Sequence, residues 1–364
     1  MNANSVCCNI KYKPNDKKYD QSIRKFQGCP TIAVTKGGRI YMGWYSGGTR
    51  EPHMENYNVV VYSDDDGKTW SEPLLVMESS KEDLIHALDV QLWLDNDGKL
   101  HVFWVQNDTY VDNGEVTWSG DQPGIVVDGY RFDDFVHAEW ETVCDNPDSD
   151  ILVFSAPRCY SRGFLRCKPT VLSNGDVLYF NYNQTSDKYG YNVSYDNGKT
   201  FTYKYGAKKL GTCGDEGMAF QMTDGTVRMF ARCRFGYLAQ SFSYDFGNTW
   251  TDATLSDIVH CDTRFFVSRT PSGNVLLVVN DDEKSRKNLT ALLSDDDGKT
   301  WKYKCLIDSR NDISYPDVDF YNGKIYLTYD RERTGCKEIL FLTFTEQEII
   351  DGKIKNPVTI VSKP

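Results

Sequence analysis

Several residues that could do chemistry stand at the starts of predicted strands. Asp89 comes directly before an apolar run, and a carboxylate at the entrance of a buried strand is costly unless it is hydrogen-bonded or used. We therefore predict that Asp89 is an acid or base in a site. Lys168 begins another strand in the same way, and we predict that it binds substrate. Two further strand starts carry Glu216, with its neighbour Asp215 as the alternative, and Tyr315. Side chains of these types at such positions are either turn residues or catalytic residues.

The overall charge limits the kinds of partner that the protein can have. The 364 residues include 41 Lys and Arg against 52 Asp and Glu, which gives a formal net charge of −11. An acidic protein gains nothing from counterion release, so we expect no nucleic-acid partner and repulsion from anionic membranes. No apolar run approaches the roughly 18 residues that a membrane-spanning helix needs. An anionic ligand would need a local cluster of arginines that reverses the overall field.

The cysteines and histidines show no spacing typical of metal ligands. The 11 cysteines are scattered without a Cys-x-x-Cys pair, which argues against a structural zinc site. His86 and His137 have no partner at ligand spacing, so we expect no metal and no cofactor. The segment Met1–Lys18 is polar and lacks the apolar stretch of a secretory signal. Together with the odd cysteine count, this predicts a cytoplasmic protein with free thiols, or a secreted one if a signal has been removed.

One short string recurs along the chain. Ser-Asp-Asp-Asp-Gly-Lys-Thr-Trp occurs at Ser63–Trp70 and again at Ser294–Trp301, with related strings at Ser194–Phe201 and Ser243–Trp250. The starts are separated by 131, 49 and 51 residues. A period near 50 fits one four-stranded propeller blade, and the long first interval has room for blades that lack the string. Asp and Gly close a tight turn while the aromatic residue packs between sheets, so we interpret the repeat as scaffold.

Strand and turn patterns predict the number of blades. Six short apolar or alternating runs each follow a Gly-containing turn, which is typical of β-hairpins. We therefore predict an all-β, six-bladed β-propeller, a single domain over residues 1–364, with blades that begin near residues 30, 88, 168, 217, 264 and 316. The N-terminal segment is expected to add a strand to the last blade and close the ring. One helix is expected, at Thr345–Asp351.

The four strings resemble the Asp-box, or BNR, repeat of the sialidases, also called neuraminidases. The order of polar residues in the second half of the chain resembles that family more specifically. Glu216 precedes Arg232 by 16 residues, as a glutamate precedes the second arginine of the sialidase triad. Arg286-Lys-Asn-Leu-Thr-Ala-Leu-Leu-Ser294 is similar to the string that carries the third arginine, and Ser314-Tyr-Pro-Asp-Val318 to the string that carries the nucleophilic tyrosine.

The resemblance implies an exo-acting, retaining glycosidase that removes a terminal acidic sugar, sialic acid or a related sugar acid, from an oligosaccharide or glycoconjugate. Tyr315 would be the nucleophile, because a neutral phenol is not repelled by the carboxylate of the sugar. Glu216 would take the phenolic proton, since the ordinary pKa of tyrosine is near 10. Arg232 and Arg286 would bind the sugar's carboxylate through their planar forks. Arg234 points to the same side of its strand as Arg232 and is a further candidate.

Two parts of the family's site are displaced in this chain. Gly28 stands where the motif Arg-Ile-Pro of sialidases has the first triad arginine, and Arg24 is the nearest candidate for that role. The acid/base that follows the first strand is also displaced, with Glu51 and Glu55 as local candidates. We predict that Glu55 or Asp89 serves as the acid/base.

Two other functions remain open at this stage. The protein could be another exo-glycosidase or a polysaccharide lyase on uronate or deoxy-sugar glycans, with Tyr315 as the acid/base. It could also be a non-catalytic glycan-binding propeller, which predicts that Tyr315 and Glu216 do not touch. Arg331 and Arg333 follow the last long strand, and we expect both to be charges at the rim.

Overall fold

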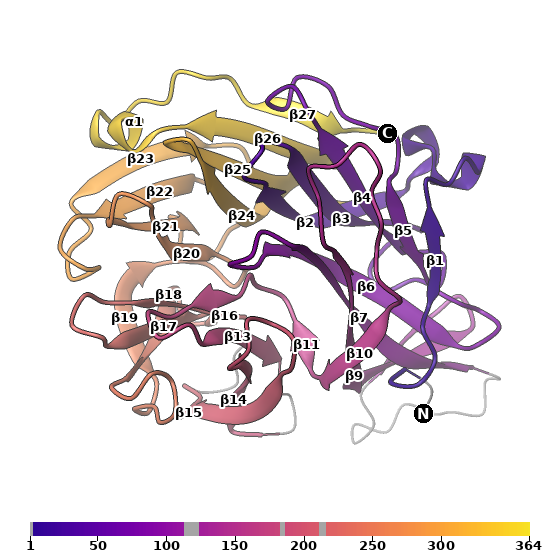
Figure 1. The fold of residues 1–364 in the computed structure, drawn as a ribbon, viewed down its shortest axis with the longest axis horizontal. Coiled ribbons are helices and arrows are strands. Elements are labelled where there is room, and N and C mark those ends of the chain that lie inside the picture. Colours follow the sequence, from indigo (N-terminus) through magenta and orange to yellow (C-terminus); the bar gives the residue numbers. More distant parts are fainter. Residues whose placement is uncertain (1–2, 113–123, 183–185, 211–215) are drawn as a thin grey trace.

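The computed structural model describes residues 3–112, 124–182, 186–210 and 216–364. They form six antiparallel sheets arranged around a common centre, so the predicted six-bladed β-propeller is confirmed (Figure 1). Blade 1 contains β2 (Phe26–Val34), β3 (Ile40–Gly47), β4 (Tyr57–Ser63), β5 (Leu75–Glu78) and β1 (Asn9–Tyr12). Blade 2 contains β6 (Ile85–Leu94), β7 (Leu100–Val111), β9 (Tyr130–Cys144) and β10 (Arg158–Arg162), with β8 (Gly124–Val127) paired to β9.

The other four blades follow in chain order. In blade 3, β11 (Phe164–Leu165) and β12 (Thr170–Val171) both pair with β13 (Val177–Tyr182), which is followed by β14 (Lys188–Ser194) and β15 (Thr202–Lys208). Blade 4 contains β16 (Gly217–Gln221), β17 (Val227–Ala231), β18 (Tyr237–Ser243) and β19 (Thr254–Val259). Blade 5 contains β20 (Phe266–Arg269), β21 (Val275–Asn280), β22 (Leu289–Ser294) and β23 (Tyr303–Asp308). Blade 6 contains β24 (Ile313–Tyr321), β25 (Lys324–Arg331), β26 (Glu338–Phe344) and β27 (Thr359–Ser362).

The helical segments are short. The predicted helix is α1 (Glu346–Ile350), which begins after the N-cap Thr345 with a reciprocal capping box to Glu348. Two 3₁₀ turns, η1 (Lys17–Tyr19) and η2 (Gln21–Ile23), lie between β1 and β2 of the first blade. Within the described ranges, no helix is long and apolar enough to cross a membrane.

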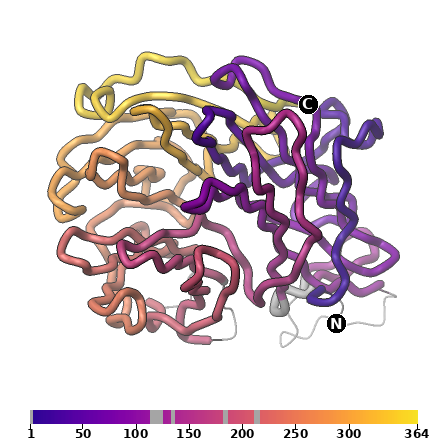
Figure 2. Tube along the Cα trace, viewed as in Figure 1, coloured from indigo at the N-terminus to yellow at the C-terminus, as the bar shows by residue number. Residues whose placement is uncertain are grey.

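The prediction that the N-terminal segment adds a strand to the last blade is wrong. β1 pairs with β5 at the outer edge of blade 1, with Asn9 opposite Glu78. The outer edge of blade 6 is already occupied, because the C-terminal strand β27 pairs with β26. The two ends of the chain meet through side chains instead: the Arg24 guanidinium donates to the Ser362 hydroxyl at 3.0 Å. Figure 2 shows the yellow C-terminal segment beside the violet first blade, where the ring closes.

The recurring strings are confirmed as scaffold. In each string the Ser hydroxyl accepts a hydrogen bond from the Gly N–H, and the Asp carboxylate accepts one from the Thr N–H. Gly67 and Gly298 have positive φ angles of 80° and 73°, which glycine adopts without strain. Neither has room for a side chain, because Phe341 and Phe220 of the preceding blades pack against them. The strings therefore hold neighbouring blades together.

Three innermost strands carry the same irregularity at the same end. Cys29, Asp89 and Tyr315 have left-handed φ angles of 55°, 44° and 56°. Each lies at a shift in pairing register: between Gly28 and Thr31, between Leu88 and Gln91, and between Ser314 and Asp317, respectively. Such β-bulges redirect a side chain and are frequent next to active sites.

A polar network lies next to the bulges and crosses between the inner strands. The Thr31 hydroxyl donates to the Asp317 carboxylate at 2.7 Å, and the Gln91 amide donates to Thr31 at 2.6 Å. The Lys168 ammonium donates to the carbonyls of Ile32 and Val318 and lies 3.5 Å from Asp317. Thr31, Gln91 and Asp317 are buried and Lys168 is largely so, and together they tie blades 1, 2, 3 and 6 at the ring's centre.

Candidate active site

A cavity of about 340 Å³ opens beside the bulged ends of the inner strands. Its wall combines side chains from blades 1, 2, 4, 5 and 6 with the start of blade 3. The lining residues are Glu51, Pro52, His86, Leu88, Asn107, Ile125, His137, Phe164, Arg166, Arg232, Arg286, Tyr315 and Arg333. The chain is acidic overall, yet four of these residues are arginines. Such a local cluster reverses the overall negative field, which is the condition for binding an anion.

The predicted phenol lines this cavity, and the predicted carboxylate lies directly behind it. The Tyr315 hydroxyl donates to Glu216 Oε1 at 2.7 Å, and the residues are 3% and 1% exposed. Burial alone would raise the pKa of Glu216, but Arg232, Arg166 and the tyrosine hydrogen bond lower it to about 2. Burial and then the charge of Glu216 raise the pKa of Tyr315 above its ordinary value. At neutral pH the pair is thus a neutral phenol beside an ionised proton acceptor.

Two predicted arginines flank this pair. Arg232 lies 3.1 Å from Glu216 Oε2 and 2.5 Å from Asp262 Oδ1, so its charge is shared between two carboxylates. Arg286 lies 5.7 Å from the centre of the Tyr315 ring. Its hydrogen bonds are long ones, to the Ser314 hydroxyl at 3.5 Å and the Asp262 carbonyl at 3.4 Å. Arg286 is therefore well placed to bind a carboxylate on a ligand.

Arg333 is a cavity residue, so the expectation that it is a rim charge is wrong. Its guanidinium lies 4.1 Å from the centre of the Tyr315 ring and donates to Asp330 at 2.9 Å. The side chain passes over Gly28: a Cβ at that position would lie 2.7 Å from Cδ and Nε of Arg333. Blade 6 thus places a guanidinium in the space that an arginine at position 28 would occupy. The missing arginine at Gly28 was the one signal in the sequence that could have pointed to a substitute.

Arg166 is a second cavity arginine that the sequence analysis missed. Its guanidinium packs on the Phe164 ring at 4.4 Å and donates to the Tyr315 hydroxyl at 3.4 Å. It also forms an ion pair with Asp89 at 2.8 Å. The nearby Lys168, predicted to bind substrate, is instead held in the buried network described above and does not line this cavity. The prediction correctly placed a cation at the start of blade 3. The side chain that reaches the cavity is, however, Arg166, two residues before Lys168.

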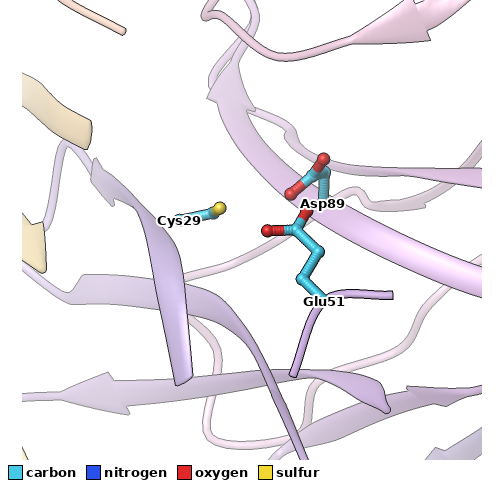
Figure 3. A group of neighbouring side chains, drawn as sticks. All are labelled: Cys29, Glu51 and Asp89. Atoms are coloured by element: carbon cyan, nitrogen blue, oxygen red, sulfur yellow. The ribbon is translucent and has the colours of Figure 1, made fainter. Parts of the chain in front are cut away.

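Two carboxyl groups and a thiol form a cluster at one side of the cavity (Figure 3). One oxygen each of Glu51 and Asp89 and the Cys29 sulfur lie within 4.8 Å of one another. Glu51 lines the cavity, while Asp89 is 3% exposed behind it. Burial, opposed by Arg166 and assisted by Glu51, raises the pKa of Asp89 to about 6. The cluster therefore holds a proton at mildly acidic pH.

The same cluster is a poor metal site, although within the described ranges it is the one group with suitable ligand atoms. Burial raises the pKa of the Cys29 thiol well above its usual value, so forming the thiolate that a metal needs costs free energy at this site. Arg166 lies 2.8 Å from Asp89, and Arg333 lies 3.4 Å from Glu51. These guanidinium groups supply the positive charge that a cation would otherwise bring. An acid/base role fits the carboxyl groups better.

Three predicted site residues lie elsewhere. Glu55 is more than half exposed and pairs with Lys81 at 3.6 Å, and it does not line the cavity, whereas Glu51 does. Arg24 packs on the ring of Trp44 at 5.6 Å and serves ring closure. Arg234 is an exposed rim residue whose side chain is 66% accessible, 3.4 Å from Asp262. Asp215, the alternative to Glu216, lies outside the described residues.

The fold and the site together define a class of protein. Six blades with Asp-box turns around a common centre, with a buried tyrosine–glutamate pair beside arginines, define a BNR-repeat β-propeller. The chain belongs to the BNR repeat-like domain family, whose model matches residues 38–327. No curated protein matches the chain.

Solved structures with the same fold are similar over almost the whole chain. The NanB sialidase of Streptococcus pneumoniae is 15% identical, with a TM-score of 0.69 over 95% of this chain and 71% of that one. The intramolecular trans-sialidase of Ruminococcus gnavus is 17% identical, with a TM-score of 0.70 over 94% and 98%. A Dyadobacter fermentans protein of unknown function is 17% identical, with a TM-score of 0.66 over 91% and 95%. At this identity the similarity establishes the fold.

Proposed function

We propose that the protein is an exo-acting glycoside hydrolase that removes a terminal acidic sugar with retention of configuration. The observation that carries the proposal is the 2.7 Å hydrogen bond between the hydroxyl of Tyr315 and Glu216 in a cavity lined by arginines. Burying an ionised carboxylate against a phenol costs free energy. A non-catalytic propeller would gain nothing in return for that cost.

The proposed reaction begins with attack of the Tyr315 oxygen on the anomeric carbon. Glu216 accepts the phenolic proton as the new C–O bond forms, and the bond to the leaving oxygen breaks as that oxygen is protonated. Water then attacks the anomeric carbon of the glycosyl–tyrosine intermediate and gives a proton to the carboxylate that had protonated the leaving oxygen. The sugar is released, and the tyrosine recovers its proton from Glu216. Arg286, Arg232 and Arg333 hold the carboxylate of the sugar during both steps.

The buried network at the ring's centre supports exo-action. The Thr31–Asp317 and Gln91–Thr31 hydrogen bonds, at 2.7 and 2.6 Å, join inner strands of three blades directly next to the bulges. A glycan chain cannot pass through such a packed centre. A terminal sugar can enter the cavity from the open side with its aglycone directed outward.

Direct assay of sugar-acid glycosides tests this function. We expect release of lactose from 3′-sialyllactose, or of the aglycone from a related acidic glycoside, with the α- or β-configuration of the substrate retained in the first product seen by NMR. Formation of an unsaturated, ultraviolet-absorbing product would instead select a lyase. Inversion of configuration, or no turnover of any acidic glycoside, would contradict the proposal.

Glu51, rather than Glu55, is proposed as the acid that protonates the leaving oxygen, with Asp89 behind it as the proton reserve. Glu51→Gln is expected to lower kcat about 100-fold for a natural glycoside, and less for an aglycone that leaves without protonation. Because the pKa of Asp89 is about 6, we expect kcat to fall as the pH rises above 6. Asp89→Asn should abolish that pH dependence. The exposed Glu55→Gln variant is the matched control, and an equal loss in both glutamine variants would refute the assignment.

A further inference from the structure

A buried arginine lies directly behind the proposed nucleophile. Arg264 is located between β19 and β20, where the chain passes from blade 4 to blade 5. It is 3% exposed and does not line the cavity, so a ligand there does not reach it. Its guanidinium lies 4.9 Å from the centre of the Tyr315 ring. A buried cation costs free energy unless it is paired and hydrogen-bonded, so its partners indicate what it is for.

The guanidinium of Arg264 holds main-chain carbonyls of three different blades. Nη1 donates to the Arg166 carbonyl at 2.8 Å, and Nη2 donates to the carbonyls of Pro30 at 2.7 Å and Tyr315 at 3.0 Å. In the described part of the chain these are its only hydrogen bonds, and its Nε is buried without a partner. The planar fork of an arginine can serve several acceptors in fixed directions, which a single ammonium group cannot do.

These three carbonyls are connected to all three bulges of the inner strands. Tyr315 is itself a bulge residue with a left-handed φ of 56°, and Pro30 lies in the bulge of β2. Arg166 forms the 2.8 Å ion pair with Asp89, the bulge residue of β6. A bulky residue at positive φ is strained and persists only where the surrounding structure fixes it. Arg264 therefore fixes the backbone that aims the phenol.

The charge of Arg264 also acts on the proton acceptor. Burial raises the pKa of Glu216, but nearby guanidinium groups, of which Arg264 is one, and the hydrogen bond from Tyr315 lower it to about 2. A substrate carboxylate in the cavity would compete for the charge of Arg232, which lines the cavity. It would not compete for the charge of Arg264, which lies behind the wall. The buried guanidinium thus remains available to Glu216 when a substrate is bound.

We propose that Arg264 is a positioning residue that fixes the backbone of Tyr315, so that the hydroxyl is aimed at Glu216, and that stabilises the ionised carboxylate from behind. The inference rests on the proposed function and adds to it a group that acts through the nucleophile and its base without contacting the substrate. Loss of Arg264 should consequently affect the chemical step far more than substrate binding.

Kinetics of two substitutions test this inference. Arg264→Met removes the charge and the fork, and we expect kcat on an acidic glycoside to fall about 100-fold while KM changes less than about 3-fold. The acid limb of the kcat profile should move to higher pH, because Glu216 must be ionised to accept a proton and loss of the cation raises its pKa. Arg264→Lys keeps the charge but not the fork. Its acid limb should stay in place, with kcat about 10-fold below that of the unaltered protein.

Arg228 provides the matched control in blade 4. It is also buried, its Nε also lacks a partner, and its guanidinium lies 4.5 Å from the Phe230 ring, outside the cavity. Arg228→Met should lower the thermal stability about as much as Arg264→Met does but leave kcat and its acid limb unchanged. An equal loss of kcat in both methionine variants, or an unmoved acid limb in Arg264→Met, would mean that Arg264 only supports the fold.

A crystal structure of Arg264→Met tests the positioning without any turnover. We expect the Tyr315 hydroxyl to move beyond about 3.5 Å from Glu216, out of hydrogen-bond reach. A retained distance of 2.7 Å, as in the unaltered protein, would overturn the inference even if the protein is a hydrolase. Absence of turnover by the unaltered protein would instead remove the proposed function and leave this structural expectation intact. If Arg264→Met does not fold, Arg264→Lys replaces it, with the same displacement of the hydroxyl expected.

Discussion

Tyr315→Phe is expected to lower kcat by at least about 1,000-fold on the acidic glycoside, with little change in KM. The substitution removes only the oxygen that attacks the anomeric carbon and leaves the ring under Arg333, 4.1 Å from the guanidinium, in place. Glu216 loses its 2.7 Å hydrogen bond but keeps Arg232 at 3.1 Å, so the fold is expected to persist. Steady-state kinetics and thermal unfolding of the variant provide the measurement.

The chain offers a matched control for this substitution in the same blade. Tyr329 is also fully buried and also donates to a carboxylate, at 2.9 Å from Asp308, but it does not line the cavity. Tyr329→Phe is expected to lower the free energy of unfolding by about 1 kcal/mol and to leave kcat unchanged. A similar loss of kcat in both variants would mean that the effect at Tyr315 is structural, and the nucleophile would have to be another group.

Moving the arginine from position 333 in blade 6 to position 28 in blade 1 is expected to change kcat/KM strongly. Arg333→Gly should lower kcat/KM about 100-fold, since one of the charged contacts to the substrate carboxylate is lost. Gly28→Arg alone should also be impaired, because the new side chain collides with Arg333, whose Cδ lies 2.7 Å from a Cβ at that position. The double variant Gly28→Arg/Arg333→Gly should recover at least about 10-fold in kcat/KM, as the new side chain enters the vacated space.

Two comparisons decide how this exchange is interpreted. Arg331→Gly removes the neighbouring arginine, which pairs with Glu338 at 3.1 Å outside the cavity, and is expected to leave kcat/KM unchanged. An uncharged amide analogue of the substrate should be insensitive to Arg333→Gly. If the double variant is no better than the worse single variant, Arg333 acts through its own contacts to Asp330 and Glu51 rather than by presenting a charge at that place.

The scaffold of this protein was predictable because its signals are short-range. Each Asp-box turn satisfies its own amides within a few residues, as in the hydrogen bonds from Gly298 to Ser294 and from Thr300 to Asp296, both 2.8 Å. Strand periodicity and Gly-containing turns likewise act locally, so the blade number and the helix near Thr345 follow from them. The N-terminal strand was misplaced because pairing at an outer edge depends on which distant segment lies beside that edge, and β27 occupies the outer edge of blade 6.

The central pair of the site was also predictable, in part because inner strands begin at one face of the ring. The four predicted residues stand at or near the ends of blade strands: the structure brings Tyr315, Arg232 and Arg286 to the wall of one cavity and places Glu216 directly behind it. The family resemblance specified which of the many tyrosines and arginines to choose. Composition alone could not have done so, since the chain has 23 tyrosines.

By itself, the sequence determined a ring of six blades, because turn chemistry and strand order are encoded within short stretches. Its resemblance to a known family indicated a phenol–carboxylate pair beside arginines at the mouth of that ring. Only the tertiary structure decided that Arg333 fills the space over Gly28, that Arg166 reaches the cavity in place of Lys168, and that Glu51 faces it while Glu55 does not. These side chains extend from loops across blade boundaries. Their positions depend on the volume that other blades leave open and on the opposite charges already present there, and no local pattern records either quantity.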